Sequence, residues 1–278
     1  MEAHPARMVR GLVAACHPGP TLVVTAAITT LALSLGRGPI GGLWVLLAVL
    51  SGQVSVGWAN DAYDAERDRQ AQRGDKPVVR GWVTERTLWV AAGTAAAACI
   101  PLSLLAGGPI GGAAHIIAVA SAWSYDLWLK TTAWSFVPYM VSFGLFAPFL
   151  TYGLTPPQPP AGWAIATLSL LGLGAHLANG IPDIDTDRAT DSHGLVARLG
   201  GRLSANLAVV ALLAATALLV GHLDLPRTTA IVILAGLTAL SVLAATLEGG
   251  RHLFRVVMLL ALTAAVLLSL NASIIVGR

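Results

Sequence analysis

Acidic residues are rare in this chain of 278 residues, and most of them lie in two short segments. Ten of the fourteen acidic residues fall within residues 61–85 and 183–191. Each segment carries part of the pattern Ala-Asn-x3-Asp-x3-Asp-Arg, which occupies residues 59–69 and again 178–188. Five positions match at identical spacing, with an offset of 119 residues. A repeat of this kind predicts two related halves that each contribute one acidic motif.

The spacing within the motif places one amide and two carboxylates on a single helix face. Residues four apart in a helix are rotated by about 40° from one another, so each copy forms a stripe of oxygen atoms. Two acidic stripes at the same depth repel each other unless a cation lies between them. Carboxylate and amide oxygens that leave room for waters and phosphates are the ligands that Mg²⁺ prefers. The predicted site is a diphosphate bridged by Mg²⁺, and its predicted metal ligands are Asn60, Asp64, Asp68, Asn179, Asp183 and Asp187.

The four stripe aspartates are also the predicted catalytic residues. The competing interpretation is that they are solvated helix ends paired with neighbouring arginines, but acids in or beside a membrane are usually functional. Asp61, Glu66 and Asp185 point off the stripes, and each either supports the site or lies in solvent. Asp191 lies one turn past Asp187 and is the candidate for the base that removes a proton from an acceptor, the alternative being a solvated helix end.

Basic residues that could bind phosphate follow or face the acidic motifs. Lys76 and Arg80 lie in a loop after the first motif that is long enough to fold over phosphates. Lys130 is the only other lysine of the chain and ends a predicted helix at the same face. This rarity favours a phosphate contact for Lys130 over simple anchoring at the membrane interface.

The elements that must position these residues are membrane helices. Apolar residues make up 55% of the chain, only 11% are charged and the mean hydropathy is +0.72, whereas soluble domains carry about 25% charged residues. Seven charge-free stretches are long enough to cross a bilayer as helices. They are residues 11–36, 38–60, 87–125, 131–182, 203–223, 228–247 and 256–277.

Two of these stretches have double length and contain strong helix breakers, Gly107-Gly108-Pro109 in one and residues 156–160 in the other. The sequence therefore predicts an all-α, polytopic membrane protein with nine transmembrane helices. We expect one domain over residues 1–278, with pseudo-repeated halves of approximately 1–130 and 131–278.

The positive charges predict the orientation of this bundle. With the N-terminus in the cytoplasm, fourteen of the seventeen Lys and Arg residues fall on the cytoplasmic side. Both acidic motifs then face the cytoplasm from the cell (inner) membrane, and the C-terminus lies outside. The basic residues are dispersed over four loops and interleaved with acids, so we expect no nucleic-acid partner. Cys16 and Cys99 lack the spacing of a metal or redox site and are expected to be packing residues.

The two motifs, their positions near helix ends and the nine expected helices together resemble the UbiA superfamily of intramembrane prenyltransferases over essentially the whole chain. This resemblance implies a helical bundle around a central cavity in which Mg²⁺ and a polyprenyl diphosphate bind between the motifs. Tyr125 and Lys130 are similar to the family's Tyr and Lys between the motifs. The expected diphosphate-binding residues are Asn60, Lys76, Arg80, Tyr125, Lys130, Asn179 and Arg188.

The predicted function is Mg²⁺-dependent transfer of an isoprenyl group from a prenyl diphosphate to an aromatic acceptor, phenolic or a quinone precursor, in contact with membrane lipid. The metal and the cations draw charge off the diphosphate as the allylic C–O bond breaks, and an apolar cavity shields the carbocation from water. A terpene cyclase without a second substrate and phosphoribosyl transfer to a polyprenyl phosphate are the enzymatic alternatives. A transporter or assembly factor is disfavoured because carriers place their ion site near the midplane, whereas these acids gather at one face.

Overall fold

The computed structural model describes residues 5–189, 193–223 and 225–246 and individual positions between 252 and 277, and these are almost entirely helical. Four helical segments of the described part are long and apolar enough to cross a membrane, and a pair bent by 62° is a fifth candidate. The four segments are Gly38–Tyr63, Glu85–Leu129, Gly162–Ala189 and Gly201–His222, and the bent pair is Pro5–Ala15 with Pro18–Ser34. The chain is thus an all-helical membrane protein.

The first part of the chain forms α1 to α5 and a π-helical turn. The bounds are α1 Pro5–Ala15, α2 Pro18–Ser34, α3 Gly38–Tyr63, α4 Ala65–Gln70, α5 Glu85–Ser124 and the π-helical turn Tyr125–Leu129. The hydroxyl of Thr84 caps α5 by accepting a bond from the Thr87 N–H at 3.1 Å. The expected break at Gly107-Gly108-Pro109 is confirmed, because Gly108 interrupts α5 with φ 65° and ψ −170°. Such a left-handed φ favours glycine.

The second part of the chain contains shorter elements. The bounds are α6 Val137–Gly144, α7 Phe146–Thr151, α8 Gly162–Gly180, a 3₁₀ turn Ile181–Asp183, α9 Ile184–Ala189, α10 Leu195–Leu199, α11 Gly201–His222, α12 Arg227–Thr246 and a 3₁₀ turn Ala272–Ile275. Non-helical backbone separates α7 from α8 at the proline-rich residues 156–160, as expected. Of the helix expected over residues 256–277, the positions described between 256 and 270 are helical, and the chain then forms the 3₁₀ turn Ala272–Ile275.

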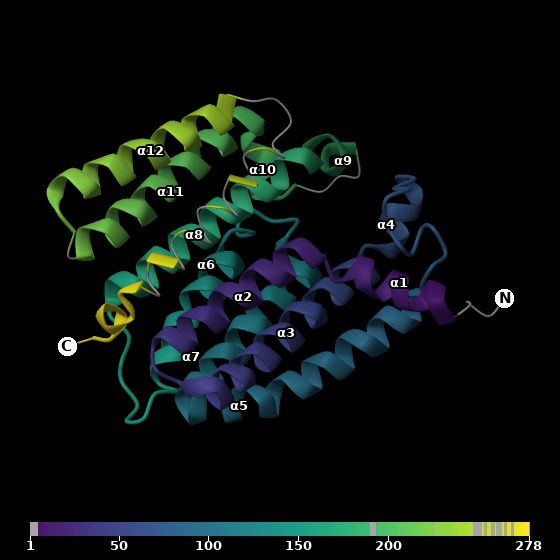
Figure 1. Ribbon diagram of the computed structural model, residues 1–278. Coiled ribbons are helices and arrows are strands. Elements are labelled where there is room, and N and C mark those ends of the chain that lie inside the picture. Colours follow the sequence, from purple (N-terminus) through teal and green to yellow (C-terminus); the bar gives the residue numbers. More distant parts are fainter. Residues whose placement is uncertain are drawn as a thin grey trace.

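The long helices lie side by side, and the short helices that carry the acids gather at one end of the bundle (Figure 1). α3 packs on α2 and α5, and α8 packs on α6 and α11. An apolar core that includes Phe149, Leu171 and Leu212 joins these helices. α4 and α9 lie at the end of the bundle where α1 lies, and the last described residues lie at the opposite end (Figure 1).

One basic side chain stabilises the end of the bundle away from the acids. Arg37, between α2 and α3, donates to the carbonyl oxygens of Ala106 and Leu150. Both carbonyls lie near helix breaks, at the kink of α5 and near the end of α7. A half-buried guanidinium thus binds carbonyl oxygens beside two helix breaks, where helix ends leave acceptors free.

The contact between α6 and α8 depends on a glycine. A Cβ atom at Gly172 would lie 2.5 Å from the backbone oxygen of Tyr139 and 3.0 Å from the Cβ of Phe143. Since the backbone oxygen cannot move away as a flexible side chain can, α8 approaches α6 this closely only without a side chain at position 172.

We therefore expect Gly172→Ala to lower the melting temperature of the detergent-purified protein by several degrees, since overpacking costs about 1–3 kcal/mol. Gly93→Ala in α5 is the matched control, because no atom lies within 4 Å of a Cβ there. Alanine is the better helix former, so the control should melt at an unchanged or higher temperature. Equal melting of both variants in a thermal unfolding assay would contradict the close packing of α6 on α8.

Candidate functional site

The first acidic stripe runs from the end of α3 into α4. The Asp64 N–H donates to the Asn60 carbonyl at 2.9 Å, and the Asp68 N–H donates to the Asp64 carbonyl at 2.8 Å. These are helical i to i−4 bonds, so they preserve the spacing of the stripe although α3 ends at Tyr63 and α4 begins at Ala65. The structure thus keeps the three residues of the first motif in the register that the sequence predicts.

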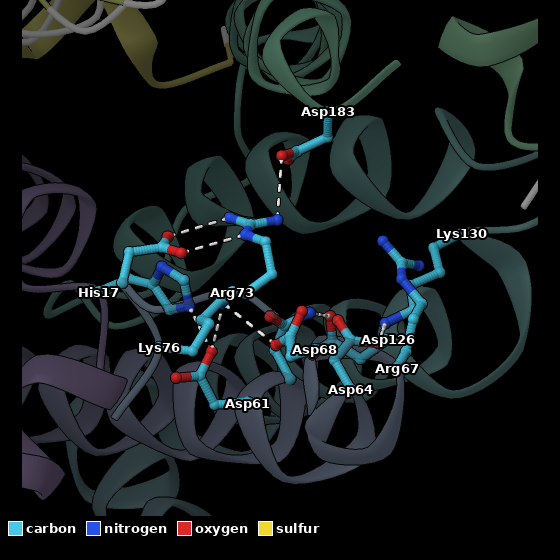
Figure 2. A network of polar contacts seen from close by, with 12 residues as sticks. His17, Asp61, Asp64, Arg67, Asp68, Arg73, Lys76, Asp126, Lys130 and Asp183 are labelled. Carbon is cyan, nitrogen blue, oxygen red and sulfur yellow. Dashed lines mark hydrogen bonds and ion pairs between the residues drawn. The ribbon is translucent and has the colours of Figure 1, made fainter. Parts of the chain in front are cut away.

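Both lysines of the chain bind carboxylates of the first motif (Figure 2). Lys130 Nζ donates to Asp64 Oδ1, and the Lys130 side chain is only 9% exposed. Lys76 Nζ lies 2.6 Å from Asp61 Oδ1 and 4.0 Å from Asp68 Oδ2. Two loops that are 54 residues apart in sequence therefore bring cations to one short stretch of carboxylates.

The pKa values of Lys76 and Asp68 reflect this packing. Burial lowers the pKa of Lys76, but the charge of Asp61 and its hydrogen bond, together with the charge of Asp68, outweigh burial and raise that pKa overall. Burial raises the pKa of Asp68, and the nearby charge of Lys76 only partly offsets this rise. Lys76 is therefore a firmly charged ammonium group beside carboxylates that have lost most of their contact with water.

The second motif crosses a helix irregularity. Asn179 belongs to α8, Asp183 ends the 3₁₀ turn Ile181–Asp183 and Asp187 belongs to α9. Pro182 lies in this turn, and proline cannot donate the backbone bond that a continuous α-helix requires. The second stripe therefore passes through one 3₁₀ turn within the helical segment Gly162–Ala189. The side chains of Asp183 and Asp187 are 43% and 21% exposed, so the second motif is more open than the first.

Two arginines from the first half join the two motifs, and Figure 2 shows the contact of one of them, Arg73, with Asp183. Arg67 in α4 donates to Asp187 Oδ1 at 2.8 Å. Arg73, in the loop after α4, donates to Asp183 Oδ1 at 3.3 Å and also binds both oxygens of Asp75 at 3.1 Å. These hydrogen bonds lower the pKa of Asp75 and raise that of Arg73. The cations expected between the two stripes are thus supplied by the protein itself.

Other predicted residues lie apart from the acids. Arg80 donates to the Gly74 carbonyl and stacks on the Trp82 ring at 4.8 Å. Arg188 donates to the Ala197 carbonyl, which links the second motif to α10. Neither arginine contacts a carboxylate of the stripes, so their role in diphosphate binding remains a prediction.

Aromatic residues surround the remaining predicted positions. The Tyr125 ring packs edge-on against Tyr139, with centroids 5.1 Å apart, and against His176 at 5.8 Å. Asn179 donates to the Tyr139 hydroxyl at 3.4 Å. Tyr125 therefore lies near the second motif through this aromatic group. Asp191, the candidate base, lies outside the described residues.

Arg67, Arg73 and Asp61 are the site residues that sequence reasoning did not assign. Asp61 is only 2% exposed and binds Lys76 and, at 3.2 Å, the ring of His17. The only sequence feature that could have indicated a role for Asp61 is its position directly after Asn60 of the first motif. No local signal pointed to the two arginines, because their partners lie 120 and 110 residues away in sequence.

Comparison with known proteins identifies the relatives of this chain. The sequence matches the model of the UbiA prenyltransferase family over residues 21–262, which is most of the chain. None of the curated proteins matches the sequence.

Three solved structures share the fold. A UbiA homolog from Archaeoglobus fulgidus bound to DMAPP and Mg²⁺ is 13% identical, with a TM-score of 0.65 over 92% of this chain and 98% of that chain. The same homolog bound to GPP and Mg²⁺ is 14% identical, with the same TM-score and coverage. A structure of digeranylgeranylglyceryl phosphate synthase is 14% identical, with a TM-score of 0.62 over 96% and 99% of the two chains. At such low identity these similarities establish the fold.

The pairing of Arg73 with Asp183 predicts competition between arginine and metal. Arg73→Gln should tighten the binding of Mg²⁺ alone by about two- to fivefold, because a part-exposed ion pair of up to about 1 kcal/mol no longer competes for the carboxylate. The same variant should weaken the binding of pyrophosphate in the presence of Mg²⁺, because a cation is lost. Isothermal titration calorimetry on the detergent-purified protein measures both affinities.

Arg69→Gln is the matched control for this experiment. Arg69 pairs with Glu66 and Glu85, which lie outside the two stripes. We expect this control to leave the affinity for Mg²⁺ unchanged. An equal effect of both substitutions, or none in Arg73→Gln, would show that the pair with Asp183 does not compete with metal.

Proposed function

Because the chain belongs to the UbiA prenyltransferase family, we propose that it transfers an isoprenyl group from a prenyl diphosphate to an aromatic acceptor. The proposed acceptor is a phenol or a quinone precursor, and the proposed Mg²⁺ site lies between the two motifs. The observation that carries this proposal is that arginines of the first motif region pair with both aspartates of the second. Two carboxylate stripes that share one set of cations form a single anion-rich site. The A. fulgidus homolog bound to DMAPP or GPP with Mg²⁺ supports the choice of donor and metal.

The charges of the described site fit a bound divalent cation. Carboxylates outnumber the Lys and Arg cations by seven to four in the polar network. The carboxylates are Asp61, Asp64, Asp68, Asp75, Asp126, Asp183 and Asp187, and the cations are Arg67, Arg73, Lys76 and Lys130. One buried oxygen, Oδ2 of Asp126, has no hydrogen-bond partner among the described residues. An oxygen-only donor set with a surplus of negative charge suits Mg²⁺, with Asn60, Asp64, Asp68, Asn179, Asp183 and Asp187 as the proposed ligands.

In this proposal the Arg and Lys side chains of the site bind carboxylates first and phosphate oxygens afterwards. Without ligands, Arg67, Arg73 and Lys130 neutralise the stripe aspartates. If the carboxylates hold metal, these cations would be available to bind phosphate oxygens. Mg²⁺ supplies Lewis-acid stabilisation of the negative charge on the departing diphosphate. The Lys and Arg side chains already lie at the carboxylates, so they would stabilise the charge of the diphosphate without a large rearrangement of the protein.

We propose that the apolar helices and the aromatic side chains around Tyr139 surround the isoprenyl end of the donor. Tyr139 is tied to Asn179 of the second motif, so its ring lies beside the place where the diphosphate is proposed to leave. Aromatic ring faces stabilise a nearby cation, and apolar walls exclude the water that would quench it. Asp191 remains the proposed base for the proton lost by the acceptor.

The full membrane arrangement also belongs to this proposal. We infer nine transmembrane helices in two pseudo-repeated halves around a central cavity, with the N-terminus and both motifs in the cytoplasm and the C-terminus outside. The excess of Lys and Arg residues in the segments assigned to the cytoplasmic side of the membrane supports this orientation. The location of α1, α4 and α9 at a common end of the bundle is consistent with it (Figure 1).

The reaction is tested with purified protein, Mg²⁺ and a radiolabelled prenyl diphosphate, with and without a pool of phenolic acids or of a glyceryl phosphate. We expect a prenylated phenol whose mass is that of the acceptor plus the isoprenyl group less one hydrogen, and diphosphate release that depends on the phenol. Asp64→Ala and Asp183→Ala should each reduce turnover by about a hundredfold or more, because removing a metal ligand costs several kcal/mol of transition-state stabilisation.

The other outcomes have distinct meanings. A cyclic hydrocarbon without an acceptor would indicate a terpene cyclase, and a product with the glyceryl phosphate alone would reject the aromatic acceptor. Residual activity above a tenth of wild type in both folded Ala variants would contradict the metal assignment.

Lys130 gives a further test of diphosphate binding. Lys130→Ala should raise the KM for the prenyl donor much more than the KM for the acceptor, because the lost contact is to the donor. Lys130→Arg should rescue only in part, since a planar guanidinium does not reproduce the position of an ammonium group. Both constants are measured on variants normalised to folded protein. An unchanged donor KM in Lys130→Ala would remove Lys130 from the diphosphate site.

A further inference from the structure

Asp126 is a buried carboxylate that the proposed reaction leaves without a role. It lies in the π-helical turn Tyr125–Leu129 that follows α5, and it is only 2% exposed. Its Oδ1 accepts a hydrogen bond from Asn60 Nδ2 at 2.9 Å. Its Oδ2 has no partner among the residues that the structure describes. A buried carboxylate with one free oxygen is costly, so its presence calls for an explanation.

The bond from Asn60 fixes the orientation of the Asn60 amide. A carboxylate only accepts hydrogen bonds, so the group that Asn60 turns toward Asp126 must be its NH₂. The amide oxygen of Asn60 therefore points away from Asp126. This oxygen is the atom that a metal would bind, because an amide nitrogen is not a ligand for a hard cation.

The turn that carries Asp126 is matched in register to the first motif. Asp126 contacts Asn60, and Lys130 contacts Asp64, so residues four apart on one segment meet residues four apart on the other. Asp126 is thereby placed in the same polar network as Asp64 and Lys130 (Figure 2).

We propose that Asp126 is a positioning residue of the metal site, which holds the Asn60 amide with its oxygen available to Mg²⁺. The inference rests on the proposed function, since it takes Asn60 as a metal ligand. Outer carboxylates that orient a metal ligand typically account for a 10- to 100-fold effect on metal affinity. The alternative is that the Asn60–Asp126 bond is only a polar link between α3 and the end of α5.

The test measures metal binding without donor or turnover. Affinity for Mn²⁺, followed by its electron paramagnetic resonance signal, is compared for Asp126→Leu and Asp126→Asn in detergent-purified full-length protein. Asp126→Asn keeps an oxygen that accepts from the Asn60 amide but removes the charge, whereas Asp126→Leu removes both. We expect Asp126→Leu to weaken Mn²⁺ binding by about 10- to 100-fold and Asp126→Asn to weaken it less.

The difference between the two variants isolates the orientation of Asn60. Placed in an Asn60→Ala background, Asp126→Leu and Asp126→Asn should bind Mn²⁺ equally, because there is no amide left to orient. The inference would be overturned if Asp126→Leu and Asp126→Asn bound Mn²⁺ equally in protein that retains Asn60. It would also be overturned if their difference in affinity persisted in the Asn60→Ala background. Asp126→Ala serves as a second apolar variant if Asp126→Leu does not fold, as judged by its melting temperature.

Ser55→Ala is the matched control. Ser55 lies on α3, is fully buried and accepts a bond from Trp123 Nε1 at 3.2 Å, so it forms the neighbouring polar link between α3 and α5. Its loss should leave the affinity for Mn²⁺ unchanged, and a loss equal to that of Asp126→Leu would make Asp126 a packing link. Unchanged affinity in both Asn60→Ala and Asp64→Ala would instead reject the metal site of the proposed function.

Discussion

The structure depends on the neutralisation of carboxylates at one end of an apolar bundle. A buried or half-buried carboxylate without a cation is expensive, and the cost grows where the surroundings exclude water. Asp61, at 2% exposure, binds Lys76, and Asp187 binds Arg67. The pairs Arg67–Asp187 and Arg73–Asp183 connect segments that lie more than 100 residues apart. The same requirement for positive charge therefore joins the two motifs.

Membrane helices constrain how such a site is built. The bilayer requires nearly every backbone group to be bonded within a helix, so side chains can be redirected only by local changes of helix type. One such change precedes Lys130, at the π-helical turn Tyr125–Leu129, and another contains Asp183, at the 3₁₀ turn Ile181–Asp183. Each lies beside a residue of the acidic network. Two of the irregular turns thus lie where acidic and basic side chains converge, while α3, α8 and α11 remain regular.

The two motifs are alike in sequence but differ in their surroundings. Asp68 in the first is 4% exposed and close to Lys76, whereas Asp183 in the second is 43% exposed at its side chain and paired with an arginine on a loop. The first motif is therefore a rigid part of the bundle. The second, which Pro182 separates into short helices, is the more accessible side of the site.

Much of this protein was determined by its sequence alone. The apolar stretches and their breaks predicted an all-helical membrane protein and the kink at Gly108, and the repeated motif predicted both the family and the two groups of acids. These features are local, because hydropathy and residue spacing act over one or two helical turns. Lys76 and Lys130 were predicted to bind phosphate, and in the structure they bind Asp61 and Asp64 of the first acidic segment.

Only the tertiary structure decided which cation meets which acid. Fifteen arginines of nearly equivalent chemistry are present, and their pairing depends on how the halves pack. Arg80 and Arg188 follow the motifs in sequence but bind backbone carbonyls, whereas Arg67 and Arg73 reach across to the second motif. The contact of Asp126 with Asn60 likewise spans 66 residues. Helix geometry sets the spacing within each motif, but a charge pair forms only where the folded chain brings its partners within a few ångströms.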